Sequence, residues 1–213
     1  MKSYLIIGLG SFGHHLCKCL AKQKCEIMLA DKNGDNLEDL LSYAVSAKVG
    51  NCTNPAVLKS FGIPEFDACF VCVGDNFQES LEITWLLKEL GARRVLSKAD
   101  EDVQAKFLLR NGADQVIYPE LSAAEQIAVS ESSDNIFSCM DLTGDYKICE
   151  INLLPAWAGK NVIELEMRKN YRLTVLAVLR KGEMMVMPEP DVRFEEGDHL
   201  MVLGHIRDVE NVT

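Results

Sequence analysis

The chain has 213 residues, of which 48% are hydrophobic and 25% charged, a balance typical of a globular protein with one large or two modest domains. Its net charge of -10 and its scattered lysines and arginines argue against a nucleic-acid partner, which normally meets a basic surface. No apolar run approaches the roughly 20 residues that cross a bilayer, and no cleavable leader is recognisable, so we expect a cytoplasmic protein.

The first element in chain order is a hydrophobic strand, Tyr4-Leu-Ile-Ile, that runs directly into a Gly-x-Gly-x-x-Gly turn. Glycines at positions 8, 10 and 13 let the backbone turn tightly, approach phosphates and pack the next helix on the strand. Amides at the start of that helix attract the phosphate charge. The motif therefore predicts a nucleotide site, although a turn that serves packing alone would show the same glycines.

The next strand, residues 25–31, ends in an acidic residue, Asp31. A carboxylate at this point accepts hydrogen bonds from both ribose hydroxyls and repels a 2′-phosphate, which favours adenosine or NAD over NADP. The alternative for Asp31 is a helix-capping role.

Strands and helices then alternate as far as residue 120, which predicts a doubly wound parallel sheet of the Rossmann type. We expect helices through Phe12–Leu20, Leu37–Leu41, from Pro55, 83–90 and 103–111, and strands at 47–51, 67–74, 94–98 and 114–118. A further helix at 121–131 and a polar hinge at 130–134 follow. We place the domain boundary there, giving a nucleotide-binding domain of residues 1–134 and a smaller domain of residues 135–213.

The second domain changes to an alternating pattern, which predicts a small α+β unit dominated by strands. Strands are expected at 149–153, 173–179, 184–187 and 199–203, with a short helix at 161–169 and a hairpin turn at Lys181-Gly182. The eight cysteines, among them Cys149, lie inside expected helices and strands and not in a loop-rich framework. We therefore expect reduced thiols that act as small hydrophobic side chains.

Ligands of a doubly wound sheet bind beyond the carboxyl ends of its strands. In this chain those ends hold Gly8 to Gly13, Asp31, Asn51-Cys52, Gly74-Asp75 and Lys98. Lys98 either balances phosphate charge or pairs with Asp100 or Glu101, and Glu120 either binds a cation near the phosphates or is an inert exposed carboxylate. The second domain is poor in candidate acids and bases, so binding without chemistry is favoured and no catalytic residue is predicted. The alternatives are an NAD-dependent oxidoreductase and, less favoured, an NAD redox sensor acting on DNA.

Several motifs in order resemble the RCK domain, the regulator of potassium conductance, and in particular the cytosolic regulatory subunits of Ktr/Trk potassium-uptake systems. They are Gly8-Leu-Gly-Ser-Phe-Gly13, Ala30-Asp31, Gly50-Asn-Cys-Thr53, Val73-Gly-Asp-Asn76, Lys98-Ala99, Asn111-Gly-Ala-Asp114 and, in the second domain, Phe194-Glu-Glu-Gly-Asp198 and Leu200-Met-Val-Leu-Gly204. The resemblance implies an ATP-, ADP- or NAD(H)-binding domain, homodimers that assemble into an octameric ring, and gating of a separate membrane potassium transporter subunit at the inner face of the cell membrane.

The resemblance also implies residue roles. Gly8, Gly10 and Gly13 would contact phosphate, Asp31 the ribose, Asn51 and Cys52 the base, and Gly74, Asp75 and Lys98 the mouth of the pocket, with Ser11, Phe12 and Lys32 completing the binding set. Glu120 matches a residue that helps hold Mg²⁺ or another divalent cation between paired protomers. In some relatives the C-terminal subdomain binds cyclic di-AMP, and Arg168, Asn170 and Pro188 fall near the matching positions.

One residue departs from the family pattern. Many members carry an arginine at the position of Ser11, and that arginine reaches the terminal phosphate of ATP in the neighbouring protomer. A serine there leaves the choice between ATP and ADP open.

Overall fold

The computed structural model describes residues 1–132 and 135–212 and divides into two compact units, Met1–Leu121 and Ser122–Thr213. Helix α5 (Pro119–Ser132) crosses this division. The predicted boundary after residue 134 touches positions 133 and 134, which lie outside the described residues, and it stays a prediction. The segment expected to form a hinge from residue 130 is helical through Ser132, and its last two positions lie outside the described residues.

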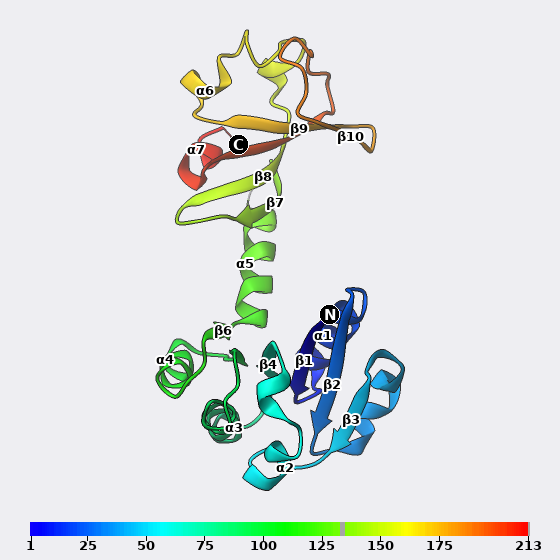
Figure 1. The fold of residues 1–213 in the computed structure, drawn as a ribbon. Coiled ribbons are helices and arrows are strands. Elements are labelled where there is room, and N and C mark those ends of the chain that lie inside the picture. Colours follow the sequence, from blue (N-terminus) through cyan, green and yellow to red (C-terminus); the bar gives the residue numbers. More distant parts are fainter. Residues whose placement is uncertain (133–134, 213) are drawn as a thin grey trace. The chain divides into compact units, whose positions relative to one another are not determined.

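The first unit is built on one parallel sheet, whose strand order among the described residues is β3-β2-β1-β4-β5-β6 (Figure 1). Adjacent strands pair in parallel throughout, and Ile7 of β1 lies level with Ala30 of β2 and Val71 of β4. The order reverses between β1 and β4, which is where a doubly wound sheet binds its ligands. The strands are β1 (Lys2–Ile7), β2 (Cys25–Asp31), β3 (Ser46–Val49), β4 (Ala68–Val71), β5 (Val95–Lys98) and β6 (Gln115–Ile117).

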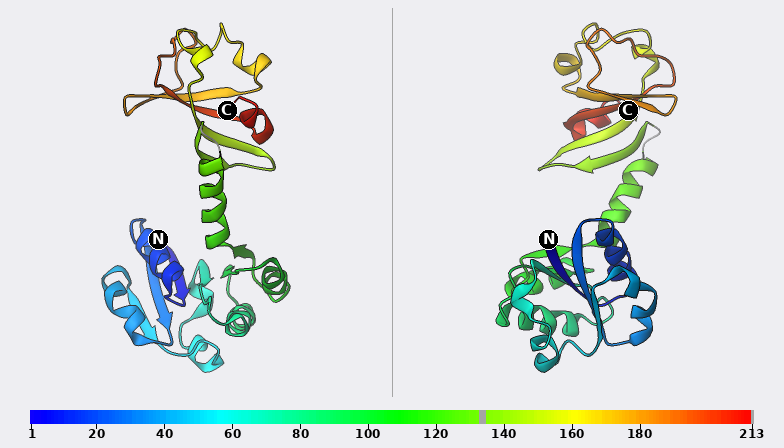
Figure 2. Two further views of the ribbon diagram at one scale, coloured as in Figure 1. Left: turned by 180° about the vertical axis from the view of Figure 1, so that it is seen from behind. Right: turned by 45° about the vertical axis from the view of Figure 1, so that its right-hand side comes forward.

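Helices cover both faces of this sheet (Figure 2). They are α1 (Ser11–Ala21), the 3-10 helix η1 (Gly34–Tyr43), α2 (Pro55–Lys59), the 3-10 helix η2 (Ile63–Glu65), α3 (Phe77–Glu89) and α4 (Asp102–Arg110). Successive side chains of a strand point to opposite faces. Accordingly, Ile6 packs with the cluster beneath α1 and η1, whereas Leu5 and Ile7 pack with the cluster beneath α2 and α3. The predicted doubly wound fold is confirmed.

Side-chain caps explain where two helices on the ligand side of the sheet begin. The Asn54 side chain accepts a hydrogen bond from the Ala56 amide at 3.0 Å, with Pro55 in the first helical position. The Asn76 side chain accepts from the amides of Gln78 and Glu79 at 3.1 and 3.3 Å and so fixes the start of α3. The predicted start of a helix at Asn54-Pro55 is therefore confirmed.

The second unit contains an antiparallel sheet in the order β10-β9-β11-β8-β7 (Figure 1). Its core gathers Trp157, Phe194, Leu200 and Val202 under that sheet. The predicted α+β class of this domain is confirmed. The elements are β7 (Ile136–Asp141), β8 (Tyr146–Asn152), η3 (Pro155–Trp157), α6 (Met167–Asn170), β9 (Thr174–Arg180), β10 (Glu183–Val186), β11 (His199–His205) and α7 (Ile206–Glu210).

Backbone conformation accounts for both the successes and the errors of the pattern in this unit. Lys181 and Gly182 have φ values of 51° and 84°, as a tight hairpin turn requires, and β9 and β10 pair around them as predicted. The helix expected over 161–169 is shorter, because Glu166 adopts a left-handed conformation (φ 47°) and helix α6 starts only after it. Strand β7 and helix α7 were not expected from the sequence.

The expectation that all eight cysteines are reduced is wrong for Cys139 and Cys149. Cys139 of β7 lies directly opposite Cys149 of β8 in the antiparallel register, and the two form a disulfide. Since β7 was missed from the sequence, Cys149 had no visible partner. The cysteines at positions 17, 19, 25, 52, 69 and 72 carry free thiols.

A buried carboxylate organises the turn before β11. Asp198 is only 2% exposed and accepts hydrogen bonds from Arg180 Nε and Nη2 at 2.8 and 2.7 Å and from the Glu195 amide at 2.8 Å. Burial raises the pKa of Asp198, but the hydrogen bonds from Arg180 and Glu195 outweigh it, so the pKa lies below its usual value.

Because the pKa of Asp198 is lower in the folded than in the unfolded chain, its contribution to stability is present above about pH 4 and is lost as the pH falls through the folded value. We expect Asp198→Asn to lower the free energy of unfolding near neutral pH by about 2 kcal/mol and to flatten its acid dependence. Thermal melts between pH 7 and pH 2, followed by the fluorescence of Trp157 in a Trp85→Phe background, measure both effects, since Trp157 lies in the same core. Glu195→Gln, at a mostly exposed position, is the control, and an equal effect of both variants would contradict this account.

Candidate functional site

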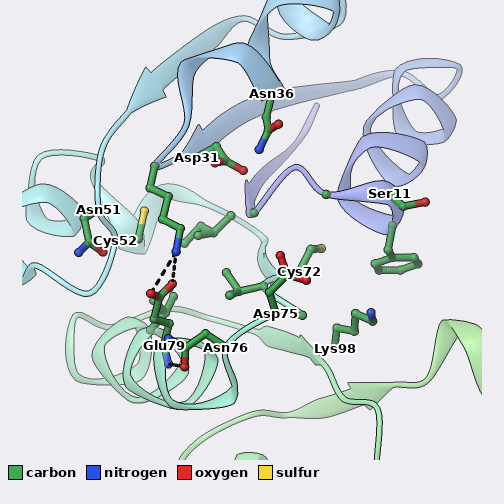
Figure 3. A pocket seen from close by; sticks show the side chains of 18 of the residues that line it. Ser11, Asp31, Asn36, Asn51, Cys52, Cys72, Asp75, Asn76, Glu79 and Lys98 are labelled. Atoms are coloured by element: carbon green, nitrogen blue, oxygen red, sulfur yellow. Dashed lines mark hydrogen bonds and ion pairs between the residues drawn. The ribbon is translucent and has the colours of Figure 1, made fainter.

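A cavity of about 350 Å³ lies at the carboxyl ends of the central strands of the first unit (Figure 3). Its size falls in the range of small-molecule sites. Twelve of the thirteen residues predicted from the sequence line it: Gly8, Gly10, Ser11, Phe12, Asp31, Lys32, Asn51, Cys52, Gly74, Asp75, Lys98 and Glu120. The cavity therefore brings together segments that are far apart in the sequence. The roles of these residues toward a ligand stay predictions.

The three glycines of the turn serve different purposes. Gly8 has a φ of +87°, and a Cβ on it would approach the Val73 amide nitrogen to 2.9 Å. A Cβ on Gly13 would overlap the carbonyl oxygen of Gly8, so Gly13 lets α1 pack against the strand and does not line the cavity. A Cβ on Gly10 would meet no atom within 4 Å. The open space at Gly10 is what a ligand group approaching the backbone needs.

The start of α1 is suited to an anion. Its N-cap residue, Gly10, provides no side-chain hydrogen bond, and the first turn contains no acidic residue. The first amides of a helix have no partner within the helix and carry a partial positive charge. Because Gly10, Ser11 and Phe12 line the cavity, a phosphate bound there would meet these amides.

Asp31 has a structural role besides the one predicted from the sequence. The side chain is buried, with one oxygen accepting from the Leu9 amide at 2.6 Å and the other from the Asn33 amide at 2.8 Å. It thus joins the glycine turn to the end of β2. Each carboxylate oxygen keeps a second lone pair, so Asp31 can still accept a hydrogen bond from a ribose hydroxyl at the cavity wall.

Of the two alternatives for Lys98, the structure shows the ion pair with Asp100, while a role in balancing phosphate charge stays a prediction for a residue that lines the cavity. Its ammonium lies 3.2 Å from Asp100 and 2.8 Å from Glu120, and its side chain is only 12% exposed. Burial lowers the pKa of Lys98, but the two carboxylates outweigh it and the pKa is raised overall, so Lys98 is a cation at neutral pH. Gly74 makes room for it, because a Cβ there would come within 3.0 Å of the ammonium.

Glu120 therefore has a partner other than a metal. The hydrogen bond from Lys98 lowers the pKa of the Glu120 carboxyl. Among the described residues, no group of three or more His, Cys, Asp or Glu side chains gathers in a way that would hold a metal ion. The predicted cation role of Glu120 stays a prediction.

Three polar residues that were not predicted as site residues, Asn36, Asn76 and Glu79, complete the polar wall of the cavity. Glu79 lies in the first turn of α3 and accepts from the Lys32 ammonium at 3.1 and 3.0 Å, so the ion pair joins the end of β2 to α3 across the cavity (Figure 3). Nothing in the sequence pattern distinguishes Glu79 from any other acidic residue at a helix start.

The cysteine thiols in the cavity wall are buried, which disfavours the thiolate form. Burial raises the pKa of Cys52 to about 12, with Asp31 adding to the effect. It raises the pKa of Cys72 to about 12 as well, although Lys98 acts in the opposite direction. Both are therefore neutral thiols at physiological pH.

A second cavity, of about 440 Å³, lies in the second unit and is lined by Arg168, Lys169, Pro188 and Pro190 among others. The family resemblance places Arg168 and Pro188 near the positions that bind cyclic di-AMP in some relatives. Asn170 does not line the cavity, and its side-chain amide donates to the Leu165 carbonyl oxygen at 2.9 Å.

No helix in the described part of the chain is long and apolar enough to cross a membrane.

The fold and the cavity together define a class of two-domain protein. In this class, a doubly wound α/β domain with an open glycine turn at its switch point is followed by a small antiparallel α+β domain. The TrkA-N domain model matches residues 4–119, and the TrkA-C domain model matches residues 150–213. The chain belongs to the TrkA-N/TrkA-C family, and the resemblance to RCK-domain proteins is confirmed.

Among curated relatives, the chain is similar to the Ktr system potassium uptake proteins C and A of Bacillus subtilis (strain 168). It is 33% identical to the first over 208 residues and 34% identical to the second over 209 residues, which covers 98% of this chain and 94% of each relative. The chain is thus a homologue of Ktr potassium uptake proteins.

Among solved structures, the chain resembles the GsuK channel, with a TM-score of 0.70 and 18% identity over 99% of this chain. The GsuK channel bound to NAD gives a TM-score of 0.67 at 18% identity over 97% of this chain. This chain spans only 38% of the length of either channel chain, and at this identity the likeness shows the shared fold.

Two glycine substitutions separate packing from ligand access. Gly13→Ala forces a methyl group onto the Gly8 carbonyl, so we expect a loss of about 1 to 3 kcal/mol in the free energy of unfolding. Gly10→Ala meets open space, so it should keep the wild-type melting temperature and weaken nucleotide binding. Chemical denaturation and calorimetric titration with ADP measure the two effects. Equal destabilisation by both substitutions would contradict the division of roles.

Proposed function

We propose that this chain is a non-enzymatic, nucleotide-binding regulatory subunit that gates a membrane potassium transporter from its cytoplasmic side. The single observation that carries the proposal is the open glycine turn beside Asp31 at the switch point, in a chain homologous to Ktr potassium uptake proteins. The turn, the ribose carboxylate and the first amides of α1 suit the phosphates and the sugar of an adenine nucleotide.

The candidate ligands are ATP, ADP and NAD(H). The NAD-bound GsuK structure supports NAD(H), because that protein shares the fold of this chain. In the proposal, Ser11 and Phe12 meet phosphate through their amides, Asn51 and Cys52 flank the base, and Lys98 lies at the phosphate end. Glu120 would take part in a divalent cation site only together with the nucleotide phosphates or a second copy of the chain, since Lys98 is its partner here.

Gating requires that the nucleotide bind more tightly to one shape of the assembly than to another, because equal affinity for both would shift nothing. A coupling of about 1 to 3 kcal/mol per site is typical. Homodimers assembled into an octameric ring would add such contributions. The acidic net charge of -10 and the homology favour a protein partner over nucleic acid.

The second cavity supports a further, separate ligand in the same proposal. Arg168 and Lys169 provide positive charge, and Pro188 and Pro190 provide apolar surface, which together suit an anionic nucleotide such as cyclic di-AMP. Binding there would add a second control on the same transporter.

Binding without turnover is supported by the chemistry of the cavity wall. Lys32 and Lys98 are ion-paired, and Asp31 accepts hydrogen bonds from two backbone amides. The thiols of Cys52 and Cys72 are neutral. An oxidoreductase would consume NADH in the presence of small carbonyl compounds. Stoichiometric binding with constant NADH absorbance is the expected result.

The proposed gating is tested by potassium flux into vesicles that contain the membrane partner and this chain. We expect flux to differ between saturating ATP and saturating ADP, or between NAD and NADH. The matched control is Gly10→Ala, which should reduce the nucleotide response and leave the basal flux with no nucleotide unchanged. Identical flux with every nucleotide would contradict gating.

A second test asks which part of the ligand each residue binds. Asp31→Asn keeps an oxygen for the Leu9 amide, loses the hydrogen bond from the Asn33 amide and removes the charge. It should weaken the binding of adenosine, ADP and ATP alike, by about tenfold. Lys98→Met should weaken ADP and ATP and leave adenosine unchanged. Calorimetric titrations measure these affinities, with melting temperatures as the check on folding. If Asp31→Asn left all affinities intact, the ribose would have been placed wrongly.

A further inference from the structure

The Lys32–Glu79 ion pair lies in the cavity wall and is left unexplained by the proposed function. Lys32 follows Asp31 directly at the end of β2, and both residues line the cavity. In dinucleotide-binding domains a cation near the ribose carboxylate accommodates the 2′-phosphate of NADP. The sequence Asp31-Lys32 therefore carries one residue that repels a 2′-phosphate and, directly after it, one that would attract it.

Glu79 determines whether repulsion of a 2′-phosphate by Asp31 or its attraction by Lys32 prevails. The Lys32 ammonium donates to both oxygens of the Glu79 carboxylate, at 3.1 and 3.0 Å, and Figure 3 draws these contacts as dashed lines at Glu79. Glu79 is the less exposed partner, with its side chain 25% exposed against 64% for Lys32. Its backbone is fixed by the Asn76 cap at the start of α3. The long lysine is thus drawn toward a carboxylate held in place by the helix.

The pair contributes little to stability, because ion pairs at exposed positions typically contribute little. Its effect lies in the charge of the cavity wall. With Glu79 present, the carboxylates of Asp31 and Glu79 outnumber the single ammonium of Lys32 at this end of the cavity. Without Glu79, the ammonium and the Asp31 carboxylate would balance, and Lys32 would be free to turn toward an added phosphate.

We propose that Glu79 is a specificity-determining residue that holds Lys32 away from the ribose and thereby excludes nucleotides that carry a 2′-phosphate. This inference rests on the proposed binding of an adenine nucleotide in the cavity. Asp31 alone does not account for the exclusion, because Lys32 would offset it. Glu79 acts through Lys32 and needs no contact with the ligand.

The test uses the full chain and two probes that differ only in the 2′-phosphate, NAD and NADP. Calorimetric titration of the wild type should show a preference for NAD. In Glu79→Gln the ratio of the two affinities should shift toward NADP by about tenfold, the effect expected for removing one unit charge near a surface site. The shift should come from tighter binding of NADP, with the affinity for NAD nearly unchanged.

Two further variants identify the cause. Glu79→Gln combined with Lys32→Gln should lose the gain in NADP affinity, because Lys32 is the group that binds the added phosphate. Glu82→Gln, on the same helix but outside the cavity, removes an equal charge and should keep the wild-type ratio.

Three results would overturn the inference. They are an unchanged NAD to NADP ratio in Glu79→Gln, a gain that persists in the double variant, and loss of NAD binding by Glu79→Gln at an unchanged melting temperature, which would make Glu79 a ligand contact. If the wild-type chain bound neither NAD nor ATP nor ADP, the proposed function would fail and this inference with it.

Discussion

The hydrogen bond from the Leu9 amide to the buried Asp31 carboxylate, 2.6 Å long, is the interaction on which the candidate site depends. It joins the turn after β1 to the end of β2, while Gly13 lets α1 pack on the Gly8 carbonyl from the other side. The turn is thereby fixed by the Asp31 contact on one side and by the packing of α1 on the other. The first amides of α1 therefore keep a constant orientation toward the cavity. A ligand would meet a site that is already formed, which reduces the ordering that binding would otherwise require.

The charges of the cavity are paired within the chain. Lys32 bonds to Glu79, and Lys98 bonds to Asp100 and Glu120. Among the described lining residues, each lysine therefore already has a carboxylate partner, and Ser11 adds no charge at the start of α1. Neutral amides and the helix dipole are left as the principal attraction for phosphate. A ligand that recruited Lys98 would have to compete with Glu120, which lies in the first turn of α5.

Much of this was predictable from the sequence, because the nucleotide-binding unit is specified locally. Its glycine spacing, its apolar strands and the cap at Asn54-Pro55 each indicate one conformation, and the predicted sheet is confirmed. Almost all residues predicted for the site line one cavity, and their roles toward a ligand stay predictions. Two of the misses arose where a partner outside the local pattern decides the outcome, one 10 residues away and the other 47. Cys149 is oxidised only because β7 places Cys139 opposite it, and Glu79 matters only because β2 ends across the cavity from α3.

Whether a contact is the same in every state of the protein or differs between states decides whether it can convert nucleotide binding into gating. Contacts that are the same in every state of an assembly add affinity and no switching, and only contacts that differ between states shift a population. Asp31 is held by two backbone amides of its own unit, so its contribution to binding should be constant. The Lys98–Glu120 pair joins the cavity to α5, the helix that leads out of the first unit. A phosphate that weakened this pair would favour any state of the assembly in which Glu120 has another partner. The free energy for gating is therefore expected at the phosphate end of the site and not at the ribose.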